Sequence, residues 1–495
     1  MRCYMDKVYT CDSVNENKNI EDIFTENKNV KLKVPNVYYK IEYDVTSKNR
    51  VTDTIIITLE HEESYIIIPA IKDDSVLDNY GLNAGYAYFI LHFISDELID
   101  LGGIERDTYE TYYFQPDDFV TNKNGKPRIL QAPIVALYAP NLFTKGLREL
   151  GYEVDYMVNC VGQDKCFLEY EPDFDLDLNG NTTEVCRART IEFMIYALKH
   201  YDIMHLHSNC SLLLGADRLW SRNSDMKYLV KMGKKIISSY WGMCDITLKG
   251  EYDSYKWHSE CNVCKKLRPN LCENDKYNSV IKVTRQCADR LLTNGRGVVT
   301  DKRTIWVDNP IEIDKYNPDI KNNIPEEFKL TQTDKLRIYH SFGNMEIRED
   351  VKGSLFVKEA VKRLQDEGYL VELMFFHKED HKNLKYYQIQ ADIVVDQLYA
   401  GWYGSTGVEC LALGIPVITY INPDVETYIK EELERDIPVV SAMPHTIYEV
   451  LKELVSNHQK RQELQKRARK YAEKYHDYRV VAEQLGRIYD DVWKG

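Results

Sequence analysis

Hydrophobic and polar positions follow two different periods along the chain, which divide it into a β-rich beginning and a longer α/β remainder. Strand-like alternation runs through VKLKV, VYYKIEYDV, TDTIIITLEH and SYIIIPAI, and a further apolar stretch, AGYAYFILHFI, follows. Alternation of this kind is typical of strands with one buried face. The hydrophilic segment VTNKNGKPR has turn chemistry and no apolar period, so it marks a boundary. We therefore predict a β-rich accessory domain over residues 1–125.

Beyond this boundary, apolar strands alternate with amphipathic helical segments. The strand ILQAPIV, the helix LFTKGLRELG and the strand VDYMVNC open the series, and the strands DIMHLHS and KKIISSYWG continue it. A second series opens with LRIYHSF after TIWVDNPIEIDKYNP, whose prolines predict a hinge. Such alternation is typical of parallel sheets covered by helices. The predicted fold class is α/β, with two Rossmann-like domains over 126–303 and 304–475, and a closing helix over 476–495 that packs back on the first domain.

Charge and hydropathy narrow the classes of partner. The 495-residue chain has a net charge of −14, which disfavours nucleic acid. There is no apolar run of about 18 residues, and the start MRCYMDKVYTCDSV lacks the charged and apolar regions of a secretion signal, so a cytoplasmic location is expected. Both charge signs alternate in the closing segment KRQELQKRARKYAEKY, which is typical of a solvated face and gives no support for peripheral membrane contact. The sequence contains no motif that indicates an oligomeric state.

The segment ADIVVDQLYAGWYGSTGVECLALGIPVITY, residues 391–420, combines a strand, a glycine turn, a helix and a second strand. Glycines at 401, 404 and 407 loosen the backbone before a helix predicted over Val408–Leu413. A helix N-terminus offers N–H groups to a phosphate, and Glu409, one turn inside, can accept hydrogen bonds from a ribose diol. We interpret this segment as a nucleotide-sugar site at the carboxyl end of a strand.

From about Arg128 to the end, the chain resembles the retaining glycosyltransferases of family 4, with GWYG, VECLALG and PV carrying the match. The resemblance implies the GT-B fold, in which two Rossmann-like domains face each other and the C-terminal one holds most of the nucleotide-sugar donor while the N-terminal one holds the acceptor. Glu409 matches the second glutamate of the family's paired motif, which binds the ribose; a helix-capping glutamate is the alternative. The first glutamate falls on Gly401, so Asp396 or the GWYG turn is expected to hold the donor sugar.

The resemblance also implies roles outside this segment. Lys352, in REDVKGS, sits where the family places a lysine that neutralises the leaving diphosphate; an exposed lysine near a helix start is the alternative. His207, the second histidine of DIMHLHSNCS, matches the one near the reacting anomeric centre, and Asp245 is the candidate acceptor-side contact. The predicted catalytic residues are His207 and Lys352, and the predicted donor-binding residues are Arg348, Lys352, Asp396, Ser405, Thr406, Gly407 and Glu409.

Two further segments contain metal-ligand residue types. Most of the 12 cysteines are scattered in apolar runs, as reduced core thiols are, but Cys261 and Cys264 have the C-x2-C spacing of a zinc ligand pair. With Cys272 and His258 they make four ligands, so the interpretations are a structural zinc site or a loop of reduced thiols. The acidic run DFDLDLNG contains D-x-D, which binds a divalent metal in other glycosyltransferases; because no strand is predicted to end there, a solvated loop is favoured.

These patterns and the resemblance predict a retaining glycosyltransferase of hexosyltransferase type, which needs no cofactor for catalysis. It would move a sugar from a nucleoside-diphosphate-sugar to an acceptor hydroxyl in glycan or glycoconjugate biosynthesis. Glycans, lipid-linked sugars and small molecules are all candidate acceptors. The main alternative is a non-catalytic nucleotide-sugar or glycan-binding protein that acts through its N-terminal domain in a complex. A two-domain nucleotide-sugar epimerase is a third hypothesis.

Overall fold

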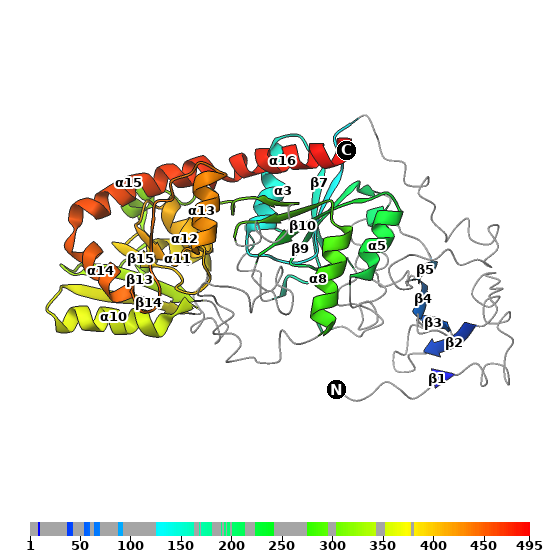
Figure 1. Ribbon diagram of the computed structural model, residues 1–495, viewed down its shortest axis with the longest axis horizontal. Coiled ribbons are helices and arrows are strands. Elements are labelled where there is room, and N and C mark those ends of the chain that lie inside the picture. Colours follow the sequence, from blue (N-terminus) through cyan, green and yellow to red (C-terminus); the bar gives the residue numbers. More distant parts are fainter. Residues whose placement is uncertain are drawn as a thin grey trace.

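The computed structural model describes most of the chain from residue 125 to residue 495, and the backbone of five strands before it. The described residues after these strands are 125–162, 168, 170–180, 190, 193–194, 196–198, 200–212, 223–241, 275–295, 303–342, 352–377 and 381–495. They form two α/β units that lie side by side, and two long helices run along one edge of both (Figure 1).

The five early strands form one antiparallel sheet in the order β1-β2-β3-β4-β5. They are β1 Val8–Tyr9, β2 Val37–Glu42, β3 Thr54–Leu59, β4 Ser64–Pro69 and β5 Tyr88–His92. The last four fall within segments whose apolar pattern predicted strands. In the register of β3 and β4, Ile55 is paired with Ile67 and Ile56 with Ile66.

The first α/β unit contains a parallel sheet in the order β12-β11-β10-β9-β6-β7-β8. Its strands are β6 Ile129–Ala132, β7 Val154–Val158, β8 Phe174–Asp175, β9 Ile203–His207, β10 Lys235–Tyr240, β11 Arg290–Thr293 and β12 Thr304–Trp306. Its helices include α3 Ala139–Glu149, α5 Ser224–Lys231 and α8 Asp275–Cys287. The central strands β6 and β9 are buried along their whole length. Their polar side chains, Gln131, His205 and His207, therefore need partners inside the protein.

Two edge strands of this sheet differ from the sequence prediction. β12 begins at Thr304, where the hinge and the second domain were expected to start, so the first unit continues to Trp306. The prolines that indicated a hinge, Pro310 and Pro318, come only after this strand. β8 lies within the acidic run DFDLDLNG, where no strand was predicted, because a two-residue edge strand is too short to show a period.

The second α/β unit contains a parallel sheet in the order β14-β13-β15-β16-β17. Its strands are β13 Leu336–Phe342, β14 Val371–His377, β15 Ile393–Val395, β16 Val417–Thr419 and β17 Val439–Ser441. Its helices are α10 Ser354–Asp366, α11 His381–Gln388, α12 Ser405–Ala412, α13 Pro423–Glu431 and α14 Ile447–Ser456. The 3-10 helices η7 Pro318–Asn323 and η8 Glu326–Phe328 precede it. The predicted pair of parallel, Rossmann-like sheets is confirmed.

The closing segment forms two helices, α15 His458–Tyr475 and α16 Tyr478–Lys494. The break falls at His476 and Asp477, and the Asp477 carboxylate caps α16 by accepting the Arg479 N–H at 3.0 Å. α15 packs against α12 of the second unit, and α16 lies against α3 of the first (Figure 1). The closing helices therefore connect both units.

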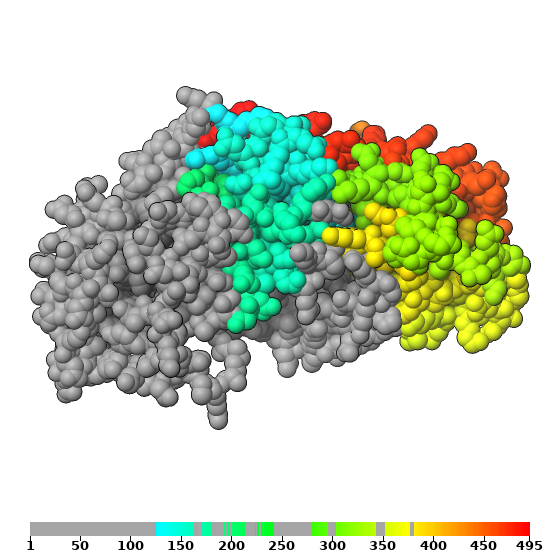
Figure 2. Space-filling model, turned by 180° about the vertical axis from the view of Figure 1, so that it is seen from behind, coloured from blue at the N-terminus to red at the C-terminus, as the bar shows by residue number. Residues whose placement is uncertain are grey.

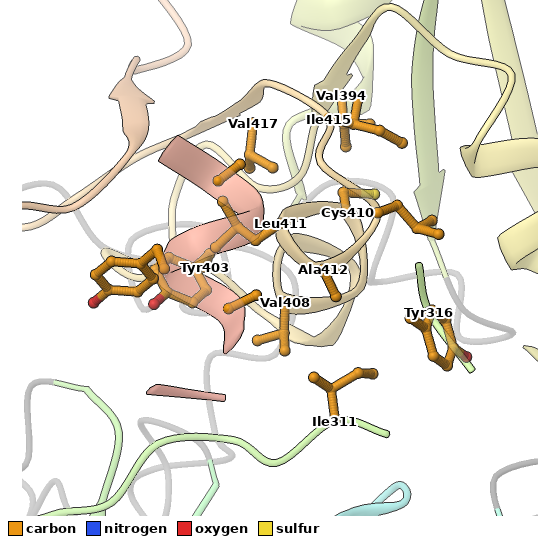
Figure 3. Packing of buried hydrophobic residues seen from close by; sticks show 14 of the residues in the cluster. Ile311, Tyr316, Val394, Tyr403, Val408, Cys410, Leu411, Ala412, Ile415 and Val417 are labelled. Atoms are coloured by element: carbon orange, nitrogen blue, oxygen red, sulfur yellow. The ribbon is translucent and has the colours of Figure 1, made fainter. Parts of the chain in front are cut away.

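One apolar cluster surrounds α12 and the segment that joins the two units. Figure 3 shows Val408 and Ala412 of α12 directed toward Ile311, while Cys410 lies toward Val394 and Ile415. Tyr138 and Leu142 of the first unit belong to the same cluster. The two units also adjoin on the face shown in Figure 2, where the cyan first unit meets the light green and yellow residues that follow it in the sequence. The burial of the apolar side chains in this cluster holds α12 against the segment that joins the two units.

Candidate functional site

In each sheet, the strands that follow the first one are added on one side and then on the other, so two neighbouring strands have connections that leave in opposite directions. Candidate residues lie at this switch point in both sheets. In the second unit the switch point falls between β13 and β15, and Asp396 directly follows β15. Lys352 ends the connection that leaves β13 and precedes α10. In the first unit the switch point falls between β6 and β9, and His207 is the last residue of β9. Ligands of open α/β sheets bind outside the carboxyl ends of strands at such points.

The Lys352 ammonium lies between Asp396 and the first turn of α12. Its Nζ is 3.1 Å from Asp396 Oδ1 and 3.5 Å from Thr406 Oγ1. The Lys352 side chain is 15% exposed, whereas the Asp396 side chain is completely buried. The Gly404 N–H donates to the other carboxylate oxygen, Oδ2, at 2.6 Å. Asp396, predicted as a donor contact, thus has both oxygens engaged by protein groups and orients Lys352 and the glycine turn.

Helix α12 begins at Ser405, three residues before the predicted start at Val408, so Gly407 lies within its first turn. A Cβ atom on Gly407 would lie 2.6 Å from Tyr403 Cβ and 3.1 Å from Asp396 Oδ2. Glycine is therefore required here for close approach and not for a turn. The N–H groups of this first turn have no acceptor within the helix, and the helix dipole makes this end partly positive. This end of α12 can receive an anion beside Lys352.

Gly401 lies where the sequence resemblance places a glutamate, and its backbone conformation favours glycine. Its φ angle is +82°, in the left-handed region that side-chain-bearing residues rarely adopt. The Asn422 N–H donates to its carbonyl at 2.8 Å, which holds the turn in this shape. A glutamate at this position would be strained, so this turn conformation disfavours the missing carboxylate.

Glu409 is buried in α12, and its carboxylate is held by two residues of α11 that sequence reasoning missed. Its Oε1 lies 2.8 Å from His381 Nε2, and the Gln388 Nε2–H donates to its Oε2 at 2.7 Å. Glu409 is only 1% exposed. The two partners precede it by 28 and 21 residues, and no local spacing rule links such distant positions. A carboxylate can accept about four hydrogen bonds, so the geometry leaves acceptor capacity.

His381 also contacts the first unit. Its ring centroid lies 5.6 Å from that of Tyr138, which precedes α3. Tyr138 belongs to the loop after β6, and His381 opens the helix that follows β14. The loops that leave the carboxyl ends of strands in both sheets therefore meet at this aromatic pair.

The two histidines of β9 lie completely buried within a polar cluster. His205 Nδ1 is 2.6 Å from Tyr489 Oη, and His205 Nε2 is 2.6 Å from Ser239 Oγ. His207 Nε2 is 2.9 Å from Gln131 Oε1, and the Trp241 indole N–H donates to His207 Nδ1 at 3.3 Å. Tyr489 comes from α16, at the far end of the chain.

Burial keeps both of these rings uncharged. Desolvation lowers the pKa of His207 to about 3, and desolvation together with the neighbouring His207 lowers the pKa of His205 well below its ordinary value. With both nitrogens of each ring engaged, neither ring is placed to exchange a proton with a ligand near neutral pH. His207, predicted as catalytic, therefore has a fixed and neutral ring in this structure.

His340, in β13, has an internal role of the same kind. Its Nδ1 lies 2.7 Å from the Val395 carbonyl oxygen and its Nε2 lies 2.7 Å from Ser354 Oγ. Burial and the nearby Lys352 lower the pKa of His340 to about 4. The neutral ring therefore ties β15 to the start of α10, beside Lys352.

The acidic run between the first-unit strands is engaged in structural contacts. Asp173 Oδ2 accepts hydrogen bonds from Arg148 and from the Tyr156 N–H, both at 2.8 Å. Asp175 Oδ1 accepts the Asp177 N–H at 2.9 Å. These carboxylates stabilise the sheet edge at β8.

Several predicted site residues lie outside the described residues: Arg348, Asp245, His258, Cys261, Cys264 and Cys272. Within the described part of the chain, no group of three or more His, Cys, Asp or Glu side chains is arranged to hold a metal ion. No helix among these described residues is long and apolar enough to cross a membrane.

Comparisons with known proteins place the fold. No family model matches the chain, and no curated protein gives a significant match. Sucrose-phosphate synthase from Thermosynechococcus elongatus is 15% identical with a TM-score of 0.51, over 74% of this chain and 99% of that one. Two further structures match at lower TM-scores. Anabaena HepE in complex with UDP-glucose is 10% identical with a TM-score of 0.48, over 74% of this chain and 100% of that one. UDP-GlcNAc 2-epimerase from Neisseria meningitidis bound to UDP-GlcNAc is 10% identical with a TM-score of 0.43, over 74% and 100%.

At 15% identity, the likeness to sucrose-phosphate synthase shows the fold alone. The fold is GT-B-like, with two parallel α/β sheets of seven and five strands in the described residues. This confirms the architecture that the sequence resemblance implied.

Proposed function

We propose that this protein is a retaining glycosyltransferase that moves a sugar from a nucleoside-diphosphate-sugar to an acceptor hydroxyl. The observation that carries the proposal is the position of Lys352 beside the first turn of α12, where β13 and β15 end. A cation and a helix N-terminus together favour a diphosphate. The GT-B-like fold supports a nucleotide-sugar as the molecule that bears it.

In the proposed reaction, the bond between the anomeric carbon and the diphosphate oxygen breaks, and the acceptor oxygen bonds to the same carbon on the same face. The acceptor proton passes to the leaving diphosphate. Lys352 and the N–H groups of residues 405–407 stabilise the charge that develops on the leaving group, so a metal ion is not required there. Asp396 holds Lys352 in position for this role. Retention without an enzyme nucleophile is what the family resemblance implies.

Glu409 is proposed to accept hydrogen bonds from the nucleotide ribose, with His381 and Gln388 orienting its carboxylate. His207 is proposed to stand near the anomeric centre, where its neutral ring and strand-end main chain are held in one orientation. Arg348 and Asp245 are proposed, from the resemblance alone, as donor and acceptor contacts. The proposed setting is glycan or glycoconjugate biosynthesis in the cytoplasm.

The test replaces the proposed diphosphate cation. Nucleotide release is measured with UDP-glucose, UDP-N-acetylglucosamine, GDP-mannose and ADP-glucose, with and without simple sugar acceptors. Lys352→Ala is expected to lower kcat about a hundredfold or more, as the loss of a charge-stabilising group does. Lys362→Ala, on the exposed face of the same α10 helix, is the matched control and should keep wild-type turnover. Melting curves identify the folded fraction of each variant, and unchanged turnover in Lys352→Ala would refute the diphosphate assignment.

The same assay separates the competing functions. The glycine at position 401 favours the non-catalytic hypothesis, because the paired motif of the resembled family has a glutamate there. Nucleotide binding without any release would support a nucleotide-sugar or glycan-binding protein that acts through its N-terminal region. Release of an epimerised free sugar would support an epimerase. Slow release of nucleotide and unchanged sugar in the absence of acceptor supports the transferase.

A further inference from the structure

The donor and the acceptor of each hydrogen bond around His207 can be assigned from the chemistry of its partners. The Trp241 indole nitrogen can only donate, so His207 Nδ1, which faces it, must be the unprotonated nitrogen. His207 Nε2 therefore carries the hydrogen and donates to Gln131 Oε1. This places the Gln131 amide nitrogen toward Tyr489 Oη, to which it donates at 2.8 Å.

The direction continues through the tyrosine. Because Tyr489 Oη accepts from Gln131, its own hydrogen is available for His205 Nδ1 at 2.6 Å. His205 then carries its hydrogen on Nε2 and donates to Ser239 Oγ. A rotated Gln131 amide would oppose Trp241, because it would force a hydrogen onto the nitrogen of His207 that the indole already faces. The donor-only indole of Trp241 thus fixes the His207 tautomer, and the hydrogen bonds of Gln131 and Tyr489 continue the network to His205.

Tyr489 is the member of this network that comes from outside the first unit's own sheet and loops. It lies 358 residues from Gln131 in the sequence and reaches β6 and β9 because α16 packs against α3. Tyr489, Gln131, His205 and His207 are all fully buried, so water cannot replace a lost partner without entering the core. The turn after His207 is also unusual, since Ser208 and Asn209 have φ angles of +56° and +54°. Such backbone persists only where the surroundings hold it.

We propose that Tyr489 is a positioning residue for His207, acting through the Gln131 amide, so that helix α16 completes the first-unit side of the site. This inference rests on the proposed function, because it assumes that His207 serves the transfer reaction. When the Tyr489 hydroxyl is removed, the Gln131 amide donor and the His205 Nδ1 acceptor both lose their partner. The Gln131 amide is then no longer held in place, so the His207 ring loses its fixed orientation, while Trp241 still sets its tautomer.

The test variant is Tyr489→Phe, which removes one oxygen and keeps the ring. Its kcat for nucleotide release is expected to fall roughly tenfold, since a small displacement of a positioned group has effects of this size or larger. The donor KM and the affinity for UDP, GDP or ADP, measured by calorimetric titration, should stay unchanged, because the diphosphate is assigned to the second unit. A fall in nucleotide affinity equal to the fall in kcat would overturn the positioning role.

Tyr152→Phe is the matched control. The Tyr152 hydroxyl also joins the first unit to α16, donating to the Gly486 carbonyl and to Asp490, but it does not contact the histidines. Tyr152→Phe should therefore keep the wild-type kcat per folded molecule. Equal losses in both variants would mean that the hydroxyls merely attach the helix.

A double variant tests whether Tyr489 acts through His207. Tyr489→Phe combined with His207→Ala should be no slower than His207→Ala alone, whereas an independent structural effect would make the losses multiply. Should Tyr489→Phe not fold, Gln131→Met interrupts the same network at its middle member and is measured in the same way. Wild-type kcat in that variant would equally overturn the inference.

A spectroscopic measurement keeps the inference separate from the proposed function. In 15N-histidine-labelled protein, the His207 ring signals, identified by their absence in His207→Gln, should show the hydrogen on Nε2. Tyr489→Phe should change these signals and Tyr152→Phe should not. If the wild type releases none of the nucleotides, the proposed function fails while these spectra still decide whether Tyr489 positions the His207 ring. Unchanged signals in Tyr489→Phe would overturn the positioning role.

Discussion

At the scale of single residues, the candidate donor site depends on buried partners that hold a few exposed atoms in place. Asp396 is fully buried and joins Lys352 to the Gly404 N–H, so one carboxylate sets the position of both the cation and the turn. Gly407 permits the close approach of Asp396 and Tyr403 to α12. The residues around the site are therefore as constrained as those of the core.

Gly407→Ala is expected to destabilise the fold, because the new Cβ would lie 2.6 Å from Tyr403 Cβ, an atom next to the backbone that has little room to move. The expected loss is about 1–3 kcal/mol, typical of overpacking. Gly404→Ala is the control, since its Cβ would be 3.5 Å from its nearest neighbours, an ordinary contact. Urea denaturation measures both variants, and equal stabilities would contradict the packing argument.

Asp396→Asn is expected to lower stability by about 1–3 kcal/mol, because Lys352 loses its countercharge at a mostly buried position. Asp366→Asn removes the carboxylate from the Lys362 pair, whose side chains are 74% and 64% exposed, and should change stability by about 0.5 kcal/mol or less. Chemical denaturation at neutral pH compares the two. A smaller effect at Asp396 than at Asp366 would mean that the buried pair does not hold Lys352.

At the scale of elements, the crossing of α3 and α16 decides how the C-terminal end of the chain reaches the first unit. Gly146 lies inside α3, where glycine normally weakens a helix. A Cβ there would lie 2.5 Å from Ala482 Cβ and 3.0 Å from the Tyr478 carbonyl oxygen, both on α16. The helices therefore approach each other closely at this glycine, which brings Tyr489 within reach of β9.

Gly146→Ala is thus expected to reverse the ordinary effect of helix propensity. Alanine would stabilise an isolated helix by about 1 kcal/mol, but here it should destabilise the protein by about 1–3 kcal/mol because α16 must move away. Thermal melting gives the sign of the change. A higher melting temperature would show that the two helices tolerate a wider separation.

At the scale of the whole molecule, buried neutral histidines connect distant parts of the fold. His205 and His207 lie in the first sheet and His340 in the second. His476 lies between α15 and α16, with Nε2 2.9 Å from Tyr403 Oη and Nδ1 2.8 Å from the Asn309 carbonyl oxygen. Burial lowers the pKa of each of these rings. Protonation therefore favours the unfolded chain, in which histidine has a pKa of about 6.5.

Because these pKa values are lowered on folding, the stability that the neutral rings contribute is complete above about pH 6.5 and is lost as pH falls toward about 4 for His340 and about 3 for His207. Each ring contributes up to about 1.4 kcal/mol per pH unit in this window. The melting temperature should fall steadily between pH 7 and pH 5, and His340→Asn should make this fall less steep. A constant melting temperature across the window would contradict the assignment of buried neutral rings.

The sequence by itself determined the class of fold and the elements that hold the candidate donor site. Apolar periodicity located β13, β15 and β16, and the glycines before Glu409 identified the turn, because strand burial and backbone freedom leave marks in neighbouring residues. Very short strands such as β8 and β12 left no usable period, so the boundary of the first unit was placed at Thr304, ahead of β12.

The tertiary structure alone decided which side chains surround each candidate residue. His381 and Gln388 on Glu409, Asp396 on Lys352, and Tyr489 on Gln131 are pairs separated by 21 to 358 residues. A buried polar group must find a partner somewhere, but its own sequence neighbourhood does not say where, since the partner is chosen by the packing of whole helices and sheets. The sequence therefore predicted where a ligand would bind, and the tertiary structure determined which side chains hold the candidate residues in position.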